Sequence, residues 1–269
     1  MASSTLSLTG LWRLLRRLGI VYKRGRQYIH SPDTHYFEKL AQVEQAKEQA
    51  RASANAANPG KVVVLFVDAV TVYRQPTVAC SYEAQGHTQP LARLSTRTNT
   101  QTRVIAGLNG VDGAVVYLRG RVSIERLVQF YRKVCATYPD AECIYVVIDN
   151  WPVYVHPDVL VALQPQRSEW VEAMQQRVPA NWPKQPSAAA LHKWGQLGLP
   201  IQLVPLPTYA SWTNPIEKLW RKLRQELVHM HALADDLEQF RAHIDLYLDQ
   251  FALGSAELLR YVGLAQPST

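Results

Sequence analysis

Two apolar runs, each followed by an aspartate, decide the predicted fold. The first is Lys61-Val62-Val63-Val64-Leu65-Phe66-Val67-Asp68, and the second is Cys143-Ile144-Tyr145-Val146-Val147-Ile148-Asp149. Continuous apolar runs of this length, rich in β-branched residues, are typical of strands that are buried on both faces of a sheet. Ligand sites of α/β proteins form where such strands end. We therefore predict a mixed α/β sheet that places Asp68 and Asp149 together at one edge.

A third acid, Glu217, lies in the first turn of a predicted helix. Asn214 is a favourable N-cap and Pro215 suits the first helical position, so a helix is expected from there to about Met230. Carboxylate oxygens are ligands of hard divalent cations such as Mg²⁺, and three converging acids therefore predict a metal site. The alternative interpretations are that each aspartate stabilises a strand-end turn and that Glu217 forms a capping box with Asn214.

Further strands and helices are expected around these runs. Strand composition recurs over 77–82, 103–108, 114–118 and 201–204. Helical spacing is found over 123–138 and 234–251, whereas residues 164–200 are rich in Gln, Trp and Pro and are interpreted as an insertion outside the sheet. The sequence thus predicts a mixed sheet flanked by helices.

The N-terminal region carries most of the net charge. The 269 residues include 29 Lys+Arg and 22 Asp+Glu, a formal charge of +7, and residues 1–30 contain six cations and no acid. We expect an amphipathic helix over 8–19, a basic wing-like turn over 20–29, and a second helix from Ser31 to about Ala50. Clustered cations favour a polyanionic partner, with a solvated helix face as the alternative. The predicted DNA-binding residues here are Arg13, Arg16, Arg17, Lys23, Arg24 and Arg26.

These segments predict the domain organisation. Residues 1–51 are interpreted as a small helical, winged helix-turn-helix remnant with a linker helix, 52–60 as a linker, and 61–269 as the α/β domain. The three cysteines match neither a disulfide framework nor a CxxC metal site. Neither an export signal nor a membrane span is expected, because no suitable apolar segment is found. A cytoplasmic, nucleoid-associated protein is therefore expected.

Three motifs resemble those of a known family. They are Phe66-Val67-Asp68, the string 147–152 (Val-Ile-Asp-Asn-Trp-Pro) followed by His156, and the string 206–220 that ends Asn-Pro-Ile-Glu-Lys-Leu-Trp. These motifs resemble the catalytic motifs of DDE transposases in the bacterial insertion-sequence branch of the mariner superfamily, over residues 61 to about 251. The resemblance implies an RNase H-like core, two Mg²⁺ or Mn²⁺ ions, and a catalytic, metal-binding triad formed by Asp68, Asp149 and Glu217.

The resemblance also implies an activity and partners. Such enzymes cleave transposon ends and transfer the freed strand into target DNA, so double-stranded DNA with terminal inverted repeats and target DNA are the expected substrates. Because transposition joins two ends, a homodimer on DNA is expected. The apolar face of 234–251 could seat the second subunit, with burial against its own core as the alternative. The competing hypotheses are another RNase H-like nuclease and a non-catalytic or truncated transposase-derived DNA-binding protein.

Other polar residues near the triad are candidates for supporting roles. An amide beside a metal-bound carboxylate can orient the carboxylate or a water, so Asn150 is a candidate, with turn stabilisation as the alternative. His156 and Asn214 are candidates for similar positions. Phosphate contacts, or a solvated helix face, are expected for the cations Lys218, Arg221, Lys222 and Arg224. The tryptophans at the strand and helix ends, Trp151, Trp212 and Trp220, are interpreted as packing residues rather than base-stacking platforms.

The chain departs from the family pattern at several points. Ala69 stands where an acid often follows the first aspartate, and Tyr154 stands where a histidine is common. The interval from Asp149 to Glu217 is wider than usual, in agreement with the expected insertion. Only about 60 residues precede the core, fewer than in most family members, which suggests a shortened product.

The N-terminal hypothesis gives a first prediction. Replacing Arg16 and Arg17 by Ala should weaken DNA binding, because each lost phosphate contact releases fewer counterions on binding. The slope of log K against log salt, measured by fluorescence anisotropy, should flatten by about one unit per lost contact. An unchanged slope would assign both arginines to a solvated helix face.

Overall fold

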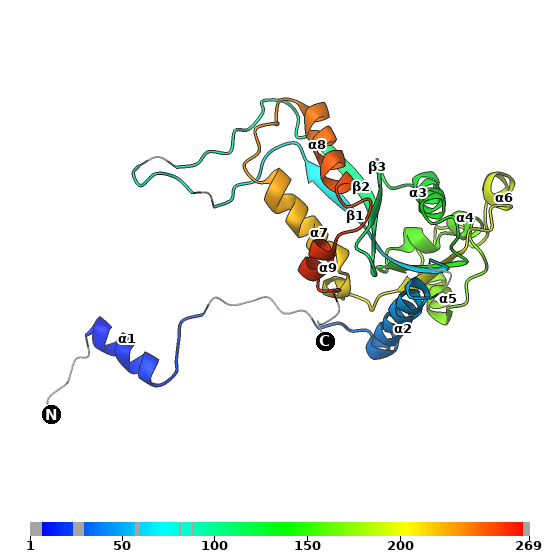
Figure 1. Cartoon of the computed structure of the whole chain (residues 1–269), viewed down its shortest axis with the longest axis horizontal. Helices are drawn as coiled ribbons and strands as arrows, with labels where there is room; N and C mark the ends of the chain where they lie inside the picture. Colours follow the sequence, from blue (N-terminus) through cyan, green and yellow to red (C-terminus); the bar gives the residue numbers. More distant parts are fainter. Residues whose placement is uncertain (1–6, 24–29, 57–59, 81, 88, 266–269) are drawn as a thin grey trace. The chain divides into compact units, whose positions relative to one another are not determined.

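The structure, a computed structural model, describes residues 7–23, 30–56, 60–80, 82–87 and 89–265. The chain separates into two compact units, residues 1–30 and 31–269, which are treated separately below (Figure 1). None of the helices in the described ranges is both long and apolar enough to cross a membrane.

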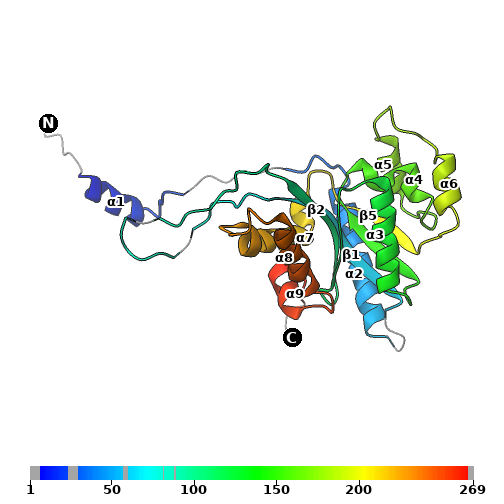
Figure 2. The same ribbon diagram turned by 90° about the horizontal axis from the view of Figure 1, so that it is seen from above.

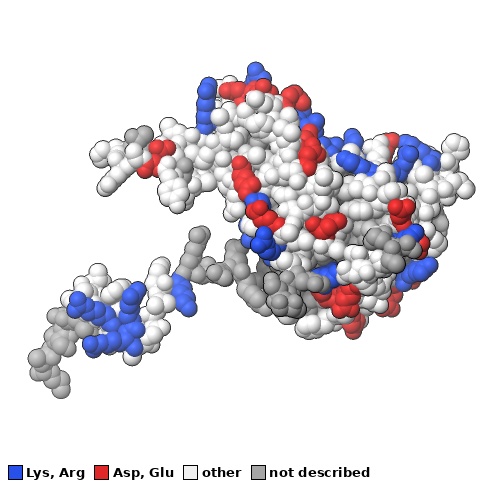
Figure 3. Space-filling model, in the orientation of Figure 1, with Lys and Arg blue, Asp and Glu red and all other residues white. Residues whose placement is uncertain are grey.

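The N-terminal unit contains the helix α1 (Leu8–Arg17), which confirms the helix expected there. Ser7 caps it by accepting a hydrogen bond from the Gly10 N–H at 3.1 Å. The helix carries basic side chains and no acidic ones (Figure 3). Residues 20–23 have no strand structure, so the first half of the expected wing is wrong. Arg24 and Arg26 lie outside the described residues.

The second unit is built on a five-stranded mixed sheet in the order β3-β2-β1-β4-β5. The pairs β1–β2 and β2–β3 are antiparallel, whereas β1–β4 and β4–β5 are parallel. Five expected strands are confirmed, but 77–82 is not a strand: in its described part Thr77 forms one isolated bridge with His229. The strands are β1 (Val62–Tyr73), β2 (Gln101–Asn109), β3 (Val115–Arg119), β4 (Cys143–Ile148) and β5 (Ile201–Pro205).

Two helical layers cover the sheet (Figure 2). Alternate residues of β1 point to opposite faces: Val64 and Phe66 join one core and Val63 and Leu65 the other. The first core is covered by α2 (Tyr36–Ala54), α7 (Ile216–Leu223), α8 (Leu237–Asp249) and α9 (Ala256–Val262). The second is covered by α3 (Ile124–Thr137), the 3₁₀ turn η1 (Pro152–Val155), α4 (Pro157–Leu160) and α5 (Glu169–Gln176).

The region 164–200 contains α5 and α6 (Ala188–Trp194) and contributes no strand to the sheet. Leu163 and Leu199, at the two ends of this region, form an isolated β-bridge. The helix expected to run from Asn214 to Met230 is α-helical only as far as Leu223 and continues as a π-helical turn, η3 (Arg224–Val228).

The apolar face of α8 was expected either to seat a second subunit or to pack on the chain's own core, and the structure shows the second. Its apolar side chains Phe240, Ile244 and Leu248 are buried in the core formed with the sheet and α7. The expectation that this apolar face seats a partner is therefore wrong, because its own core already covers it.

The helix α2 belongs to the second unit rather than to an N-terminal DNA-binding domain. It packs on β1 and β5 and buries Val43, Ala46 and Ala50. It runs to Ala54, so the expected linker 52–60 is helical at its start. Residues 57–59 lie outside the described chain. The compact second unit accordingly begins at Ser31.

The expected N-cap at Ser31 is wrong, because α2 begins at Tyr36. Ser31 instead donates its hydroxyl to the Thr208 carbonyl at 2.5 Å. Asp33 accepts from the Thr208 N–H at 2.8 Å and from the Lys39 ammonium at 2.7 Å, and both side chains of that ion pair are buried. The segment before α2 thus holds the loop between β5 and α7.

This buried ion pair gives a second prediction. Burial alone would raise the pKa of Asp33, but the hydrogen bonds from Lys39 and Thr208 outweigh it and lower the pKa to about 2. Asp33→Asn should cost about 2 kcal/mol in the free energy of unfolding at pH 7, because it leaves the Lys39 charge buried and unpaired. Urea unfolding measures this loss.

The matched control is Glu44→Gln, which breaks the exposed pair of Glu44 with Lys47 on the same helix and should cost less than about 0.5 kcal/mol. Because the folded pKa of Asp33 is depressed, its stabilisation is complete above the unfolded pKa near 4 and is lost as the pH falls towards 2. Equal losses in the two variants would contradict the buried ion pair.

Candidate active site

Strand register places the two aspartates at the same level of the sheet. Phe66 of β1 is paired with Val147 of the parallel strand β4, so Asp68 and Asp149 each lie two residues further on. Asp149 directly follows β4, as expected. Asp68, however, does not end its strand: β1 continues to Tyr73 because β2 pairs with it there, with Ala106 opposite Asp68.

Asp68 points to the face of the sheet that α7 covers. Its carboxylate accepts a hydrogen bond from the indole Nε1 of Trp220 at 2.9 Å. Trp220 is buried, which confirms its interpretation as a packing residue but adds a polar role that the sequence did not reveal. Glu217 lies three residues before Trp220, on the same face of α7. The fold therefore brings the helix acid towards the strand acid.

The charges of both other acids act on Asp68. Burial and then the negative charge of Glu217 raise the pKa of Asp68 to about 7, and Asp149 adds to the effect. Burial also raises the pKa of Asp149. The Trp151 N–H, which donates to Asp149 Oδ1 at 3.0 Å, lowers the pKa by a smaller amount. A buried carboxylate whose pKa is raised by two neighbouring carboxylates is part of a site suited to a cation.

The pKa of Glu217 is set by opposing neighbours. Burial raises it, the positive charges of Arg224 and Arg221 lower it, and the charge of Asp149 raises it, with a net shift upward. Arg221 and Arg224 are exposed on the same helical segment. The sequence indicated both arginines only as possible phosphate contacts, and their effect on the pKa of Glu217 was not predicted.

Asn214 anchors the start of α7 rather than capping it with its side chain. Its Nδ2 donates to the Val67 carbonyl at 3.2 Å, one residue before Asp68, while Glu217 N–H bonds the Asn214 backbone oxygen at 3.2 Å. This arrangement replaces the expected side-chain N-cap. The Oδ1 of Asn214 is buried and has no hydrogen-bond partner within the described residues.

The other supporting residues have structural bonds of their own. The amide of Asn150 donates to the Leu206 carbonyl at 2.8 Å and so ties the ends of β4 and β5 together. His156 is buried and accepts from the Asp158 N–H at 3.1 Å, which caps α4. These contacts position the backbone beside Asp149.

Tyr154 is the residue near the carboxylates that sequence reasoning left without a role. It is fully buried, and burial together with the charges of Asp149 and Asp68 raises its pKa well above the usual value. The hydroxyl therefore stays protonated at neutral pH. Its substitution for the family's more common histidine was the only signal in the sequence.

The predicted phosphate-contacting residues of α7 fall into two groups. Lys218 donates to the Val262 carbonyl at 2.8 Å, and Lys222 is ion-paired with Glu226. Arg221 is exposed. Two of the three cations are thus already engaged by the protein itself.

The donor chemistry fits a hard divalent cation. Within the described ranges, no three His, Cys, Asp or Glu side chains are close enough to hold one metal ion together. Mg²⁺ is commonly held by only one or two carboxylates and completed by water and substrate phosphate oxygens. Asp68, Asp149 and Glu217 supply carboxylate oxygens alone, which is the donor type that such an ion prefers.

A mixed sheet with helices on both faces and acids from β1, β4 and α7 defines an α/β protein of the RNase H-like type. Residues 63–241 match the sequence profile of the family described as DDE superfamily endonuclease, and the chain belongs to this family. The motifs identified in the sequence resemble those of transposases of the insertion-sequence and mariner group.

A curated relative is the "Insertion element IS630 uncharacterized 39 kDa protein" of Shigella sonnei. It is 22% identical over 222 residues, which covers 81% of this chain and 52% of the relative. The chain thus spans about half the length of that protein.

The solved structures with a similar fold include the "Mos1 transposase paired-end complex with left transposon end". That structure has a TM-score of 0.52 and 15% identity, over 95% of this chain and 66% of that one. The Mos1 mariner paired-end complex with Mn has a TM-score of 0.51 and 15% identity, over 96% and 67%. These likenesses confirm the predicted RNase H-like fold.

The repulsion among the acids gives a third prediction. At pH 8 in EDTA, Asp68→Asn should raise the free energy of unfolding by on the order of 2 kcal/mol, because it removes a buried charge that faces two carboxylates. The folded pKa of Asp68 is raised to about 7, so this group stabilises the fold below pH 4 and the stabilisation is lost as the pH rises through 7.

Urea unfolding at pH 5 and pH 8 should therefore show a larger gain for the variant at pH 8. Asp140→Asn, at an exposed carboxylate, is the control and should change little at either pH. A gain that does not depend on pH would contradict the raised pKa.

Proposed function

We propose that this chain is the catalytic part of a DNA transposase that cuts transposon ends and transfers the freed strand into target DNA. The observation that carries the proposal is that the charges of Glu217 and Asp149 raise the pKa of the buried Asp68, in a chain of the DDE endonuclease family. The insertion-element relative and the transposase–DNA complexes among the similar folds support it.

In this proposal the three acids hold two Mg²⁺ or Mn²⁺ ions. Bound ions would stabilise the charge that develops on the phosphodiester and activate the attacking hydroxyl. The chain's own residues supply the positioning: Trp220 fixes the Asp68 carboxylate, Asn214 fixes the start of α7, and Asn150 fixes the strand ends. Most of the rate then comes from orientation and electrostatics, as is usual in phosphoryl transfer.

Several neighbours of the triad are assigned supporting roles. His156 maintains the path after Asp149 by capping α4. The Tyr154 hydroxyl, whose pKa is raised by burial and by the charges of Asp149 and Asp68, is kept protonated near them. Arg221 and Arg224 are free to contact a DNA phosphate because they are exposed, whereas Lys218 and Lys222 would first have to leave their present partners.

The partners follow from the same reaction. Double-stranded DNA with terminal inverted repeats binds first, with the basic N-terminal unit as a second contact through Arg13, Arg16, Arg17 and Lys23. Target DNA follows. The similar Mos1 structure is a paired-end complex, and two ends must likewise meet here for strand transfer. A homodimer on DNA satisfies that need, and the buried apolar face of α8 is not available as its interface.

The proposal is tested by separating cleavage from binding. Asp149→Asn and Glu217→Gln should each reduce Mn²⁺-dependent cleavage of a duplex carrying the chain's flanking genomic DNA by at least about a hundredfold, because the lost ligand serves the metal. DNA binding by anisotropy should stay within about twofold. The matched control is Glu226→Gln, an acid on the same helical segment that is paired with Lys222.

Equal cleavage by wild type and Asp149→Asn would contradict the catalytic triad. Cleavage without any joined product would favour a nuclease rather than a transposase. Binding without cleavage by the wild type would favour a non-catalytic DNA-binding protein.

A further inference from the structure

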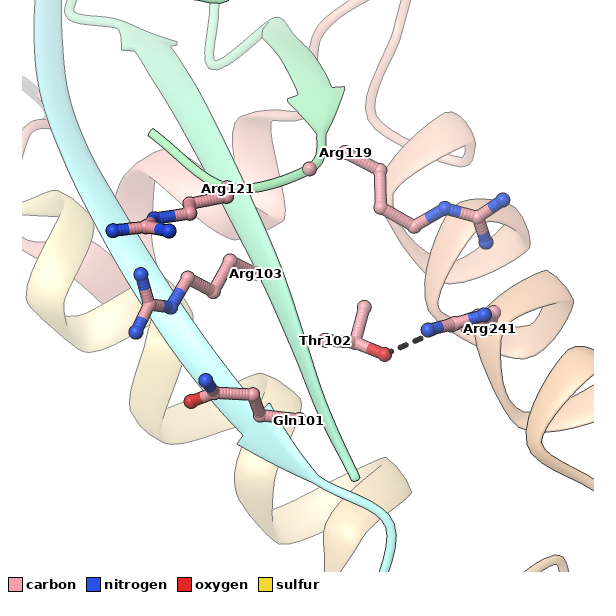
Figure 4. Close-up of a pocket in the computed structure, with 7 residues that line it drawn as sticks. Gln101, Thr102, Arg103, Arg119, Arg121 and Arg241 are labelled. Atoms are coloured by element: carbon pink, nitrogen blue, oxygen red, sulfur yellow. Dashed lines mark hydrogen bonds between the residues drawn. The ribbon is translucent and has the colours of Figure 1, made fainter. Parts of the chain in front are cut away.

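Four arginines gather in a pocket that the proposed chemistry does not use. The pocket has a volume of about 570 Å³ and lies beside the first residues of β2 (Figure 4). It is lined by Gln101, Thr102, Arg103, Arg119, Arg121 and Arg241, together with Gly120.

The pocket forms at a free edge of the sheet. The pairing of β2 with β3 ends at Val104 opposite Arg119, and one more bond joins the Gly120 N–H to the Arg103 carbonyl at 2.8 Å. On its other side β2 stays paired with β1 as far as Gln101. The short strand β3 therefore leaves the beginning of β2 uncovered, with Arg103 and Arg121 on one side of that strand and Arg119 and Arg241 on the other (Figure 4).

Only two of these four charges are neutralised within the described residues. Arg119 is ion-paired with Asp245 at 2.9 Å, and Arg241 is ion-paired with Glu238 at 2.5 Å and also donates to Thr102 at 3.1 Å. In the described chain, Arg103 and Arg121 are in no ion pair within 4 Å. The pocket therefore keeps two formal positive charges.

The Arg103 guanidinium has an unsatisfied hydrogen-bond donor. Its Nε is buried and has no partner in the described structure. A buried donor without an acceptor costs free energy, so the pocket gains from an anionic acceptor. Guanidinium groups present fixed forks of donors that match the oxygens of a phosphate, which makes phosphate a better fit than a point charge such as chloride.

The position relative to the carboxylates points to DNA. Asp68 is opposite Ala106 of β2, and Arg103 lies three residues from Ala106 along that strand. At the rise of a β-strand this is about 10 Å, which corresponds to about three nucleotides along one strand of B-DNA. Because side chains alternate along a strand, Arg103 points to the opposite face of the sheet from Ala106 and Asp68. A DNA strand with its scissile phosphate at the acids would reach the pocket by passing round the free edge at the start of β2.

We propose that the arginine pocket binds a backbone phosphate of DNA a few nucleotides from the one that is cut. Arg103 and Arg121 make the contact, and Arg119 and Arg241 hold the opposite wall through their ion pairs. The assignment of the polyanion as DNA rests on the proposed function. The contact itself requires no metal and no cleavage.

The test measures binding of a 20-base-pair duplex to the full chain by anisotropy, in EDTA, across a salt series. Arg103→Gln with Arg121→Gln should weaken binding by about tenfold and reduce the salt slope by about one unit. The matched control is Arg132→Gln with Arg177→Gln, which removes the same charge from exposed positions outside the pocket and should leave the slope unchanged.

The outcomes are decisive in each direction. An identical salt dependence for the pocket variant and the control variant overturns the proposal, as does a wild-type chain that binds no DNA. Calorimetric titration with inorganic phosphate forms the second arm. If phosphate binds the wild type and not the pocket variant while DNA binding is equal in both, the pocket is a small-anion site and the DNA assignment fails.

The assay is independent of catalysis. If Asp149→Asn leaves cleavage intact but the pocket variant loses its salt slope, the proposed catalytic triad fails and the phosphate site stands. If Asp149→Asn abolishes cleavage but the pocket variant keeps the wild-type salt slope, the catalytic triad stands and the phosphate site fails. A variant with the wild-type unfolding midpoint in urea shows that the loss is not a folding defect.

Discussion

The hydrogen bond from the Trp220 indole to the Asp68 carboxylate joins α7 to the central strand, and the geometry of the site depends on it. A second bond, from Asn214 to the Val67 carbonyl, fixes the start of the same helix one residue earlier on β1. Two attachments to consecutive residues of one strand define where α7 begins and how it is rotated. Glu217 lies between them in sequence, so its approach to Asp68 follows from both.

The attachment of α7 to β1 holds buried carboxylates near one another, which costs free energy when they are ionised. Ionisation of Asp68, Asp149 and Glu217 raises the free energy of the folded chain, because burial raises the pKa of all three acids and the charges of Glu217 and Asp149 add to the effect at Asp68. The scaffold that resists it is rigid: β1 is paired on both sides, and both helical layers bury large side chains against it. Strain of this kind is common where a protein is shaped to hold a ligand. A cation placed among the acids would relieve it.

Much of this arrangement could be predicted from the sequence. The apolar run 62–67 and the run 143–148 could only be buried strands, and parallel pairing then brought Asp68 and Asp149 level. The family motifs indicated which acids matter. The strand end at Asp68 was predicted wrongly because the continuous apolar run ends there, whereas the strand continues as an alternating segment whose pairing depends on β2, about 30 residues further along the chain.

Other features depend on contacts that local patterns do not contain. The favourable start at Ser31-Pro32-Asp33 was interpreted as a helix cap, yet these side chains bind a loop at Thr208, far away in sequence. The polar role of Trp220 and the anchoring role of Asn214 likewise require the tertiary fold. The arginine pocket draws on β2, β3 and α8, and none of its arginines stands out in its own segment.

The central claim is that the three carboxylates together form a site for divalent cations. Anomalous diffraction from crystals soaked in Mn²⁺ tests it most directly. The account predicts Mn²⁺ within about 2.5 Å of carboxylate oxygens from at least two of Asp68, Asp149 and Glu217. Mn²⁺ bound only elsewhere on the protein, with these three carboxylates unligated, would contradict it.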